Sequence, residues 1–283
     1  MPATFIGHGS PMNALERNRY TESWRAVGAA VPRPRAVLVV SAHWYINAIA
    51  VTAMPRPRTI HDFFGFPRTL FEVQYPAAGA PELADDVAEI AKPTWIGHDE
   101  DSWGLDHGTW SVLCHMFPDA DVPVVQLSIN AMKPFDYHLE LGTRLAPLRE
   151  RGVLIVGSGN VVHNLHDIDR RLAGSGFDWA QRFDDAARSA MTDSPSALPR
   201  LVDDRDFDCA VPTPDHFIPL LYLAGLASAS NRQTDVLVDG CTYGSLSMTA
   251  YTLDLRCAPP AAKSPTAGDV PDPAQIPADG TNM

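Results

Sequence analysis

Cysteine is scarce in this chain of 283 residues: there are four, at positions 114, 209, 241 and 257. They are widely spaced, and no two form the Cys-X-X-Cys pair typical of zinc knuckles and redox motifs. A disulfide framework is therefore not indicated. The spacing fits reduced thiols in a cytoplasmic protein better than a disulfide framework.

Positive charge and long apolar runs are lacking as well. The chain has 22 Lys and Arg against 34 Asp and Glu, a formal net charge of −12. Nucleic acids and anionic membrane surfaces bind clustered Lys and Arg, so we expect neither as a partner. No apolar stretch approaches the roughly 20 residues that span a bilayer, and the first residues lack a signal-peptide pattern. These features predict a cytoplasmic location.

Several common motifs of catalysis and cofactor binding are absent. The sequence contains no Gly-X-Ser-X-Gly elbow, and Ser10 and Ser158 lack the flanking glycines of that motif. It also contains neither Gly-X-Gly-X-X-Gly nor a P-loop. A serine hydrolase of the elbow type, a dinucleotide site and a P-loop nucleotide site are therefore not indicated.

Apolar, β-branched runs alternate with helical patterns along the chain. The runs cover residues 3–6, 35–44, 48–54, 122–130, 152–160 and 245–255. The helical patterns cover residues 81–92, 135–151 and 178–191. This alternation predicts an α/β fold, a single domain with a central mixed sheet flanked by helices.

A change of composition marks the end of the predicted domain, which we place at residues 1–257. Residues 258–283 contain six of the 25 prolines and no aromatic residue. Such a segment buries too little surface to offset the entropy of ordering it. We therefore predict a Pro-rich, disordered tail.

Histidine is the informative residue type, because five of the ten histidines stand at positions that could converge. His8, His43, His107 and His163 follow or end apolar runs, and His216 falls in the first turn of a predicted helix that Thr213 could cap. Strand ends and helix starts meet at pockets in α/β proteins, and imidazole is the commonest metal ligand. No two of these residues form a local metal motif, so the residues alone leave a metal site and scattered structural histidines equally open.

Eight sequence blocks occur in one order between residues 7 and 251: "GHGSPMNAL", "SAHW", "IHDFFGFP", "YPAAG", "LDHGTWSVL", "GSGNVVHNL", "TPDHFIPLLY" and "YGSLSMTAY". Together they resemble the class III extradiol ring-cleavage dioxygenases of the DOPA 4,5-dioxygenase type. The resemblance covers nearly the whole chain before the tail. It implies a single α/β domain with one metal ion in a cleft of the central sheet.

The resemblance also implies roles for individual residues. The metal ligands are expected to be His8, His43 and His216. His163 matches the catalytic acid/base, and His107 a second pocket histidine that contacts substrate or dioxygen. His61, in "IHDFFGFP", is a candidate pocket residue or a residue that orders a loop.

Asp215 could replace His216 as the third ligand. Adjacent residues on a helix point about 100° apart, so both are not expected to face one ion.

Three neutral imidazoles leave a divalent ion with its full charge and with open positions, where a catechol can bind through both oxygens. We expect one divalent metal per chain, with Fe(II) for turnover and Zn(II) as an alternative occupant after purification. The expected partners are a DOPA-like catechol and O2, for a monomer or small homo-oligomer. A zinc-dependent hydrolase and a non-catalytic metal-binding protein on the same fold are the alternatives. The presence of His163 and His107 counts against the last of these.

Overall fold

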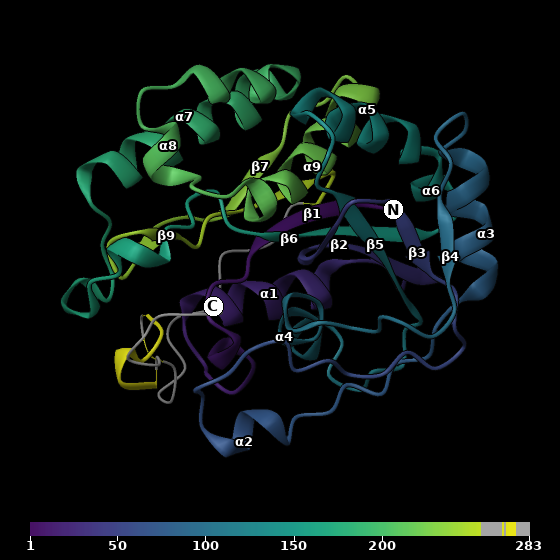
Figure 1. Cartoon of the computed structure of the whole chain (residues 1–283), viewed down its shortest axis with the longest axis horizontal. Helices are drawn as coiled ribbons and strands as arrows, with labels where there is room; N and C mark the ends of the chain where they lie inside the picture. The colour runs from purple at the N-terminus through teal and green to yellow at the C-terminus, as the bar shows by residue number, and fades with distance from the viewer. Residues whose placement is uncertain (256–267, 269, 276–283) are drawn as a thin grey trace.

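An eight-stranded mixed sheet forms the centre of the computed structural model, which describes residues 1–255, 268 and 270–275 (Figure 1). In spatial order the strands are β4 (Gly97–Asp99), β3 (Ala50–Thr52), β5 (Val124–Asn130), β2 (Ala36–Ile46), β6 (Val153–Gly159), β1 (Ala3–Gly7), β10 (Ala250–Leu253) and β7 (Asp235–Val238). The four central strands β5, β2, β6 and β1 are parallel. Antiparallel pairs join β10 to β1, β7 to β10 and β3 to β5. The predicted mixed sheet is confirmed.

Side chains of the central strands alternate between two buried cores, one on each face of the sheet. In β2, Ala36, Leu38 and Val40 belong to one core, whereas Val37 and Val39 belong to the other. A strand buried on both faces is apolar at successive positions. This explains why the sequence reads there as a continuous apolar run.

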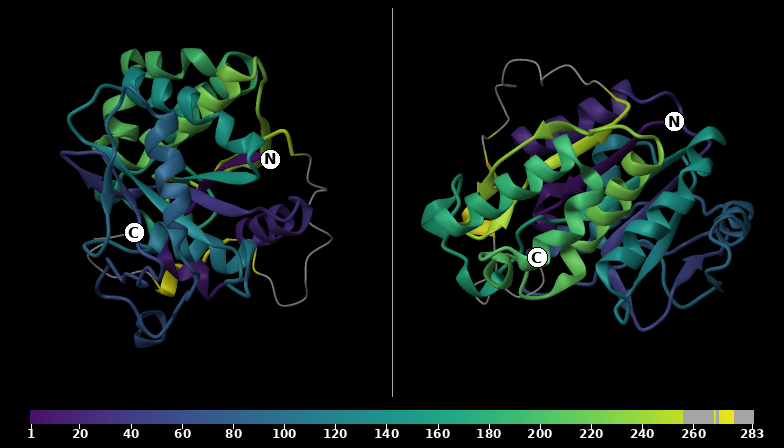
Figure 2. Two further views of the ribbon diagram at one scale, coloured as in Figure 1. Left: turned by 90° about the vertical axis from the view of Figure 1, so that its right-hand side faces the viewer. Right: turned by 90° about the horizontal axis from the view of Figure 1, so that it is seen from above.

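Helices cover both faces of the sheet (Figures 1 and 2). One core is packed by α3 (Pro81–Ile90), α5 (Phe135–Leu145), α6 (Pro147–Glu150), α7 (Asp178–Asp193), α8 (Phe207–Ala210) and α9 (Ile218–Ala229). The other is packed by α1 (Arg19–Ala30), α2 (Arg68–Phe71) and α4 (His107–Met116). Short 3-10 turns are η1 (Pro11–Ala14), η2 (Leu165–Asp167), η3 (Arg170–Leu172), η4 (Pro195–Asp203), η5 (Pro214–His216) and η6 (Pro273–Gln275).

Several elements differ from the sequence prediction. The helix predicted over 135–151 is divided into α5 and α6, because Pro147 has no N–H to continue the helical hydrogen bonds. The run 245–255 forms two strands, β9 (Leu246–Ser247), which pairs with β8 (Cys241–Thr242), and β10. Helix α4 was not predicted from the sequence, because nearly all its residues are buried and it lacks an amphipathic period.

The predicted tail lies mostly outside the described residues, as does its boundary at 257–258. Of the described part, the Gly268 N–H donates to the Arg17 carbonyl at 2.8 Å, and the Asp272 N–H donates to Glu16 Oε2 at 3.1 Å. Within the described residues, no helix has the length and apolar character needed to cross a membrane.

Candidate active site

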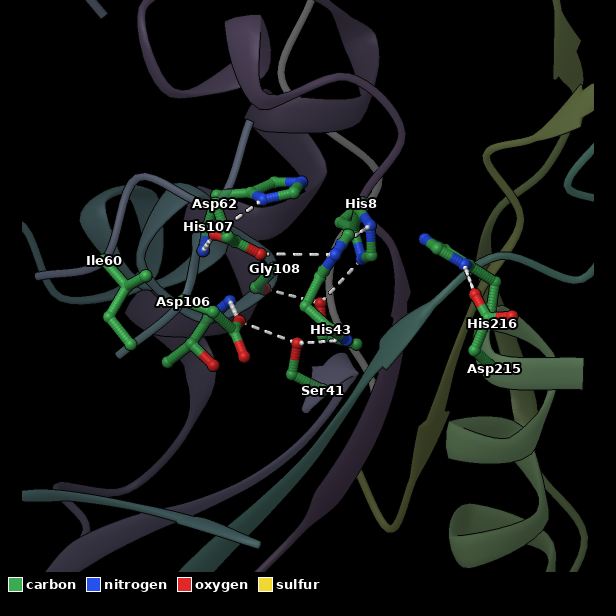
Figure 3. Close-up of polar contacts among 12 residues, drawn as sticks. His8, Ser41, His43, Ile60, Asp62, Asp106, His107, Gly108, Asp215 and His216 are labelled. Carbon is green, nitrogen blue, oxygen red and sulfur yellow. Dashed lines mark hydrogen bonds and ion pairs between the residues drawn. The ribbon is translucent and has the colours of Figure 1, made fainter. Parts of the chain in front are cut away.

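The carboxyl ends of the parallel strands bring three of the predicted histidines to one edge of the sheet. His8 directly follows β1, and His163 follows β6 by four residues. His43 lies within β2, where the pairing with β5 shifts register between Val40 and Tyr45. Such an irregularity redirects side chains at a strand end. In Figure 3, His8 and His43 lie side by side at this edge.

His107 reaches the same region from a helix start rather than from a strand end. It is the first residue of α4, and Asp106 is the N-cap, whose carboxylate accepts from the Thr109 N–H at 3.1 Å. The Ser41 hydroxyl also donates to Asp106, at 2.7 Å, and so ties the helix start to β2. Burial raises the pKa of Asp106 to about 6, and the nearby charge of Asp62 adds to this.

His216 comes from the turn η5, directly before α9. The predicted helical start is confirmed as a 3-10 turn with Thr213 at the N-cap position, but the Thr213 side chain makes no capping hydrogen bond to a backbone N–H. The Thr213 hydroxyl instead hydrogen-bonds Asp215. Asp215 in turn binds Nδ1 of His216, so this turn is arranged around the imidazole.

The rings of His8, His43 and His216 lie at nearly equal distances from one another. The ring centres are 5.1 Å apart for His8 and His43, 5.3 Å for His8 and His216, and 5.0 Å for His43 and His216. With metal–nitrogen bonds of about 2.0–2.1 Å, two imidazoles bound to one ion have centres roughly 4.5–5.2 Å apart. The three rings therefore have the spacing of a tris-imidazole site.

Each of these three imidazoles has a neighbouring polar side chain at its Nδ1 atom. Nδ1 of His8 lies 2.9 Å from the Ser158 hydroxyl oxygen, and that hydroxyl donates to the Gly108 carbonyl at 2.5 Å. Because the serine proton is used there, the oxygen accepts from Nδ1–H of His8. A proton on Nδ1 leaves the Nε2 lone pair of His8 for a metal.

The other two rings have a carboxylate in the same place. Asp62 Oδ2 lies 3.4 Å from Nδ1 of His43, and Asp215 binds Nδ1 of His216. Nε2 of His216 is buried and has no hydrogen-bond partner among the described residues. A buried imidazole nitrogen without a partner fits a metal ligand.

Among the described residues, two separate groups offer ligand atoms within 4.8 Å of one another: His8 with His43 and His107, and His163 with Asp215 and His216. The ring contacts of His216 with His8 and His43 join the two groups, so all five predicted histidines lie at one site. The His163 ring stacks on the His216 ring, with centres 3.4 Å apart and planes 4° apart. The residues present fit one divalent ion.

The surroundings favour neutral imidazoles at the site. Burial lowers the pKa of His8 well below its usual value, and the neighbouring His43 and His216 lower it further. Burial and His107 likewise lower the pKa of His43, against the opposing effect of Asp62. A metal ligand must be unprotonated, so these shifts prepare both rings for binding.

His61 lies outside both groups of ligand atoms. Its Nε2 donates to the Val73 carbonyl at 2.9 Å, and its ring contacts Phe63, Phe71 and Trp110. These contacts order the loop before α2. The exposed His166 is likewise in neither group of ligand atoms.

Two residues of this site, Asp62 and Ser158, were not predicted from the sequence. Asp62 stands next to His61 in "IHDFFGFP", and Ser158 lies in "GSGN", so both were inside blocks already quoted. Burial raises the pKa of Asp62, but His107 and His43 outweigh burial and hold this pKa below its usual value. The group is therefore a carboxylate at neutral pH.

Gly108 allows the start of α4 to approach β2, and we expect Gly108→Ala to disturb the site. An added Cβ would lie 2.6 Å from Ser41 Oγ and 2.8 Å from Cδ2 of His43. Overpacking of this kind costs about 1–3 kcal/mol. Thermal unfolding should show a lower melting temperature than that of wild type, and a smaller rise in melting temperature when zinc is added.

Ser111→Ala is the control for this substitution, because it removes a buried hydroxyl from the same helix without adding an atom. If the two variants had equal melting temperatures and an equal rise in melting temperature with zinc, the role given to Gly108 would be contradicted.

Comparison with known proteins places this fold and site among ring-opening dioxygenases. Residues 3–253 match the family "Catalytic LigB subunit of aromatic ring-opening dioxygenase". A relative from Escherichia coli (strain K12), "4,5-DOPA dioxygenase extradiol", is 46% identical over 257 residues, covering 89% of this chain and 94% of that protein. A protein of the same name from Beta vulgaris is 34% identical over 255 residues, covering 87% and 94%.

A solved structure agrees with the sequence relatives. The crystal structure of an uncharacterised protein from Escherichia coli K12 matches with a TM-score of 0.78 and 41% sequence identity, covering 89% of this chain and 99% of that one.

Fold and site together define a metal-dependent ring-cleaving oxygenase. The chain belongs to the LigB family, the class III extradiol dioxygenases. The family predicted from the eight sequence blocks is confirmed.

Proposed function

We propose that this enzyme opens the aromatic ring of a DOPA-like, catechol-bearing small molecule with O2, at one metal ion held by His8, His43 and His216. The arrangement of the three imidazoles carries the proposal, because their ring centres lie 5.0–5.3 Å apart and each has a partner at Nδ1, which leaves Nε2 for a metal. The names of the relatives from Escherichia coli and Beta vulgaris support the substrate class.

His216 is preferred to His107 as the third ligand. The centres of the His43 and His107 rings are only 3.8 Å apart, less than two imidazoles on one ion usually require. The His43–His216 and His8–His216 spacings, 5.0 and 5.3 Å, are close to the expected range. Asp215 also holds Nδ1 of His216, the arrangement that commonly orients a metal-binding histidine.

A bound metal would supply positive charge that favours loss of a phenolic proton, and Fe(II) would also relay electrons from the catecholate to dioxygen. Zinc has no redox change of its own. We therefore assign Fe(II) to turnover, with Zn(II) as an occupant that binds without supporting oxygen chemistry.

His163 is the proposed acid/base. Its ring is parallel to that of His216, so it lies beside the proposed metal, where a bound catechol presents its hydroxyl groups. An imidazole titrates near neutral pH and can accept a phenolic proton and later return it. We assign to His107, whose ring centre is 5.8 Å from that of His8, the contact with the substrate or dioxygen.

The test is to load metal-free protein with Fe(II) under anaerobic conditions and then to add O2 and a panel of catechols. Formation of a yellow semialdehyde, with one O2 consumed per ring opened, is the expected result. Zinc-loaded protein is the control and should bind catechol without opening it. Fe(II)-loaded protein that consumed no O2 with any catechol would contradict the proposal.

A further inference from the structure

One carboxylate lies between two histidines to which the proposed function gives different roles. Asp62 Oδ2 is 3.4 Å from Nδ1 of His43, and Asp62 Oδ1 is 3.0 Å from Nδ1 of His107. Oδ1 also accepts the backbone N–H of His107 at 2.9 Å. Figure 3 shows these contacts, with each oxygen of Asp62 directed to a different imidazole.

The chain just before Asp62 is attached to the start of α4 through both polar groups of the Ile60 backbone. The Ile60 N–H donates to the Leu105 carbonyl at 2.7 Å, and the Trp110 indole N–H donates to the Ile60 carbonyl at 2.7 Å. Asp62 itself has 17% of its side chain exposed. The loop that carries the carboxylate is therefore fixed to the start of α4, the helix that begins with His107.

We propose that Asp62 is a positioning residue that aligns His43 for the metal and His107 for the catechol at the same time. The inference rests on the proposed function, because it assigns the two histidines to metal and substrate. It goes beyond that function by making one carboxylate responsible for both.

The chemistry of a carboxylate explains how this works. An ionised carboxylate only accepts hydrogen bonds, so it favours the proton on Nδ1 of both rings and leaves both Nε2 lone pairs free. Both ring nitrogens of His107 are buried and neither has a hydrogen-bond partner of good geometry among the described residues, but Nδ1 has Asp62 Oδ1 as an ion-pair partner at 3.0 Å, so Nε2 is the atom left to receive a ligand. Because the two ring centres are 3.8 Å apart, a turn of one ring displaces the other.

The experiment uses zinc-loaded protein, so it does not depend on turnover. Zinc affinity is measured by competition with a chelator, and binding of 4-nitrocatechol at saturating zinc is followed by its absorbance. For Asp62→Ala we expect zinc affinity to fall by about 10–100-fold, the usual effect of removing a group that orients a ligand. We also expect nitrocatechol affinity to fall by about tenfold, the effect of losing one hydrogen bond to a charged group.

Two comparisons separate positioning from a general loss of structure. Asp215→Ala is the matched control, since Asp215 contacts His216 and not His107, and it should lower zinc affinity alone. In a double-mutant cycle, Asp62→Ala should cause no further loss of nitrocatechol affinity once His107→Ala is present. A merely structural role would give additive losses.

Asp62→Asn provides a second variant of nearly the same shape, should the alanine variant fail to fold. Its amide nitrogen must donate, so it favours the opposite tautomer in one of the two rings, and either zinc or nitrocatechol affinity should fall. Thermal unfolding shows whether each variant is folded.

Three results would overturn the inference: both affinities within twofold of wild type in the folded variants, loss of zinc affinity alone in Asp62→Ala, or additive losses in the cycle. Wild-type protein that bound zinc but not nitrocatechol would contradict the proposed function itself, and with it the part of the inference that concerns His107.

Discussion

Replacing His163 with alanine is expected to remove ring opening while the metal stays bound. The His163 ring stacks on that of His216, one of the three imidazoles proposed as ligands, so His163 is beside the proposed metal without being needed to hold it. Loss of a proton-transfer group typically lowers a rate by about 10²–10⁴-fold. Metal content and single-turnover oxygen consumption, measured on the same preparation, give both parts of this result.

The exposed His166, three residues further along, provides the matched control. His166→Ala should retain metal and full activity. If His163→Ala were purified without metal and could not be reloaded, His163 would be a ligand. Full ring opening by His163→Ala would assign the acid/base role elsewhere, with His107 as the next candidate.

Replacing His216 with alanine is expected to empty the metal site. Structural zinc sites with four ligands bind with about 10–16 kcal/mol, or roughly 3 kcal/mol for each ligand. Loss of one of three protein ligands should therefore lower metal affinity by about 10²-fold or more, and ring opening should be lost with the metal. Chelator competition with Zn(II) and Fe(II) measures the change.

His107→Ala is the comparison that decides between the two candidate ligand sets. His8 and His43 are common to both sets, so only His216 and His107 distinguish them. We expect His107→Ala to keep its metal and to bind catechol more weakly. If His107→Ala lost the metal and His216→Ala retained it, the ligand set would be His8, His43 and His107.

The histidines themselves could be identified from the sequence, and their arrangement could not. His8, His43 and His163 follow apolar runs that form parallel strands, so the sequence places them at one edge of the sheet. The eight ordered blocks indicate the family because they match motifs along most of the chain. These are local properties, which depend on the residue types and their order.

The partners of those histidines were decided by the tertiary structure. Three of these partners, Asp62, Ser158 and Asp215, contact Nδ1 of a histidine. The contacts of Asp62 and Ser158 join residues that are distant in the chain: Ser158 is 150 residues from His8. His107 proved to start a helix because Asp106 caps it, and the burial of α4 hides the period that would have revealed that helix. The sequence determines which side chains are available, whereas hydrogen-bond geometry depends on how strands and helices pack across the sheet. That packing gives each imidazole its tautomer, and with it the nitrogen that is left to bind a metal.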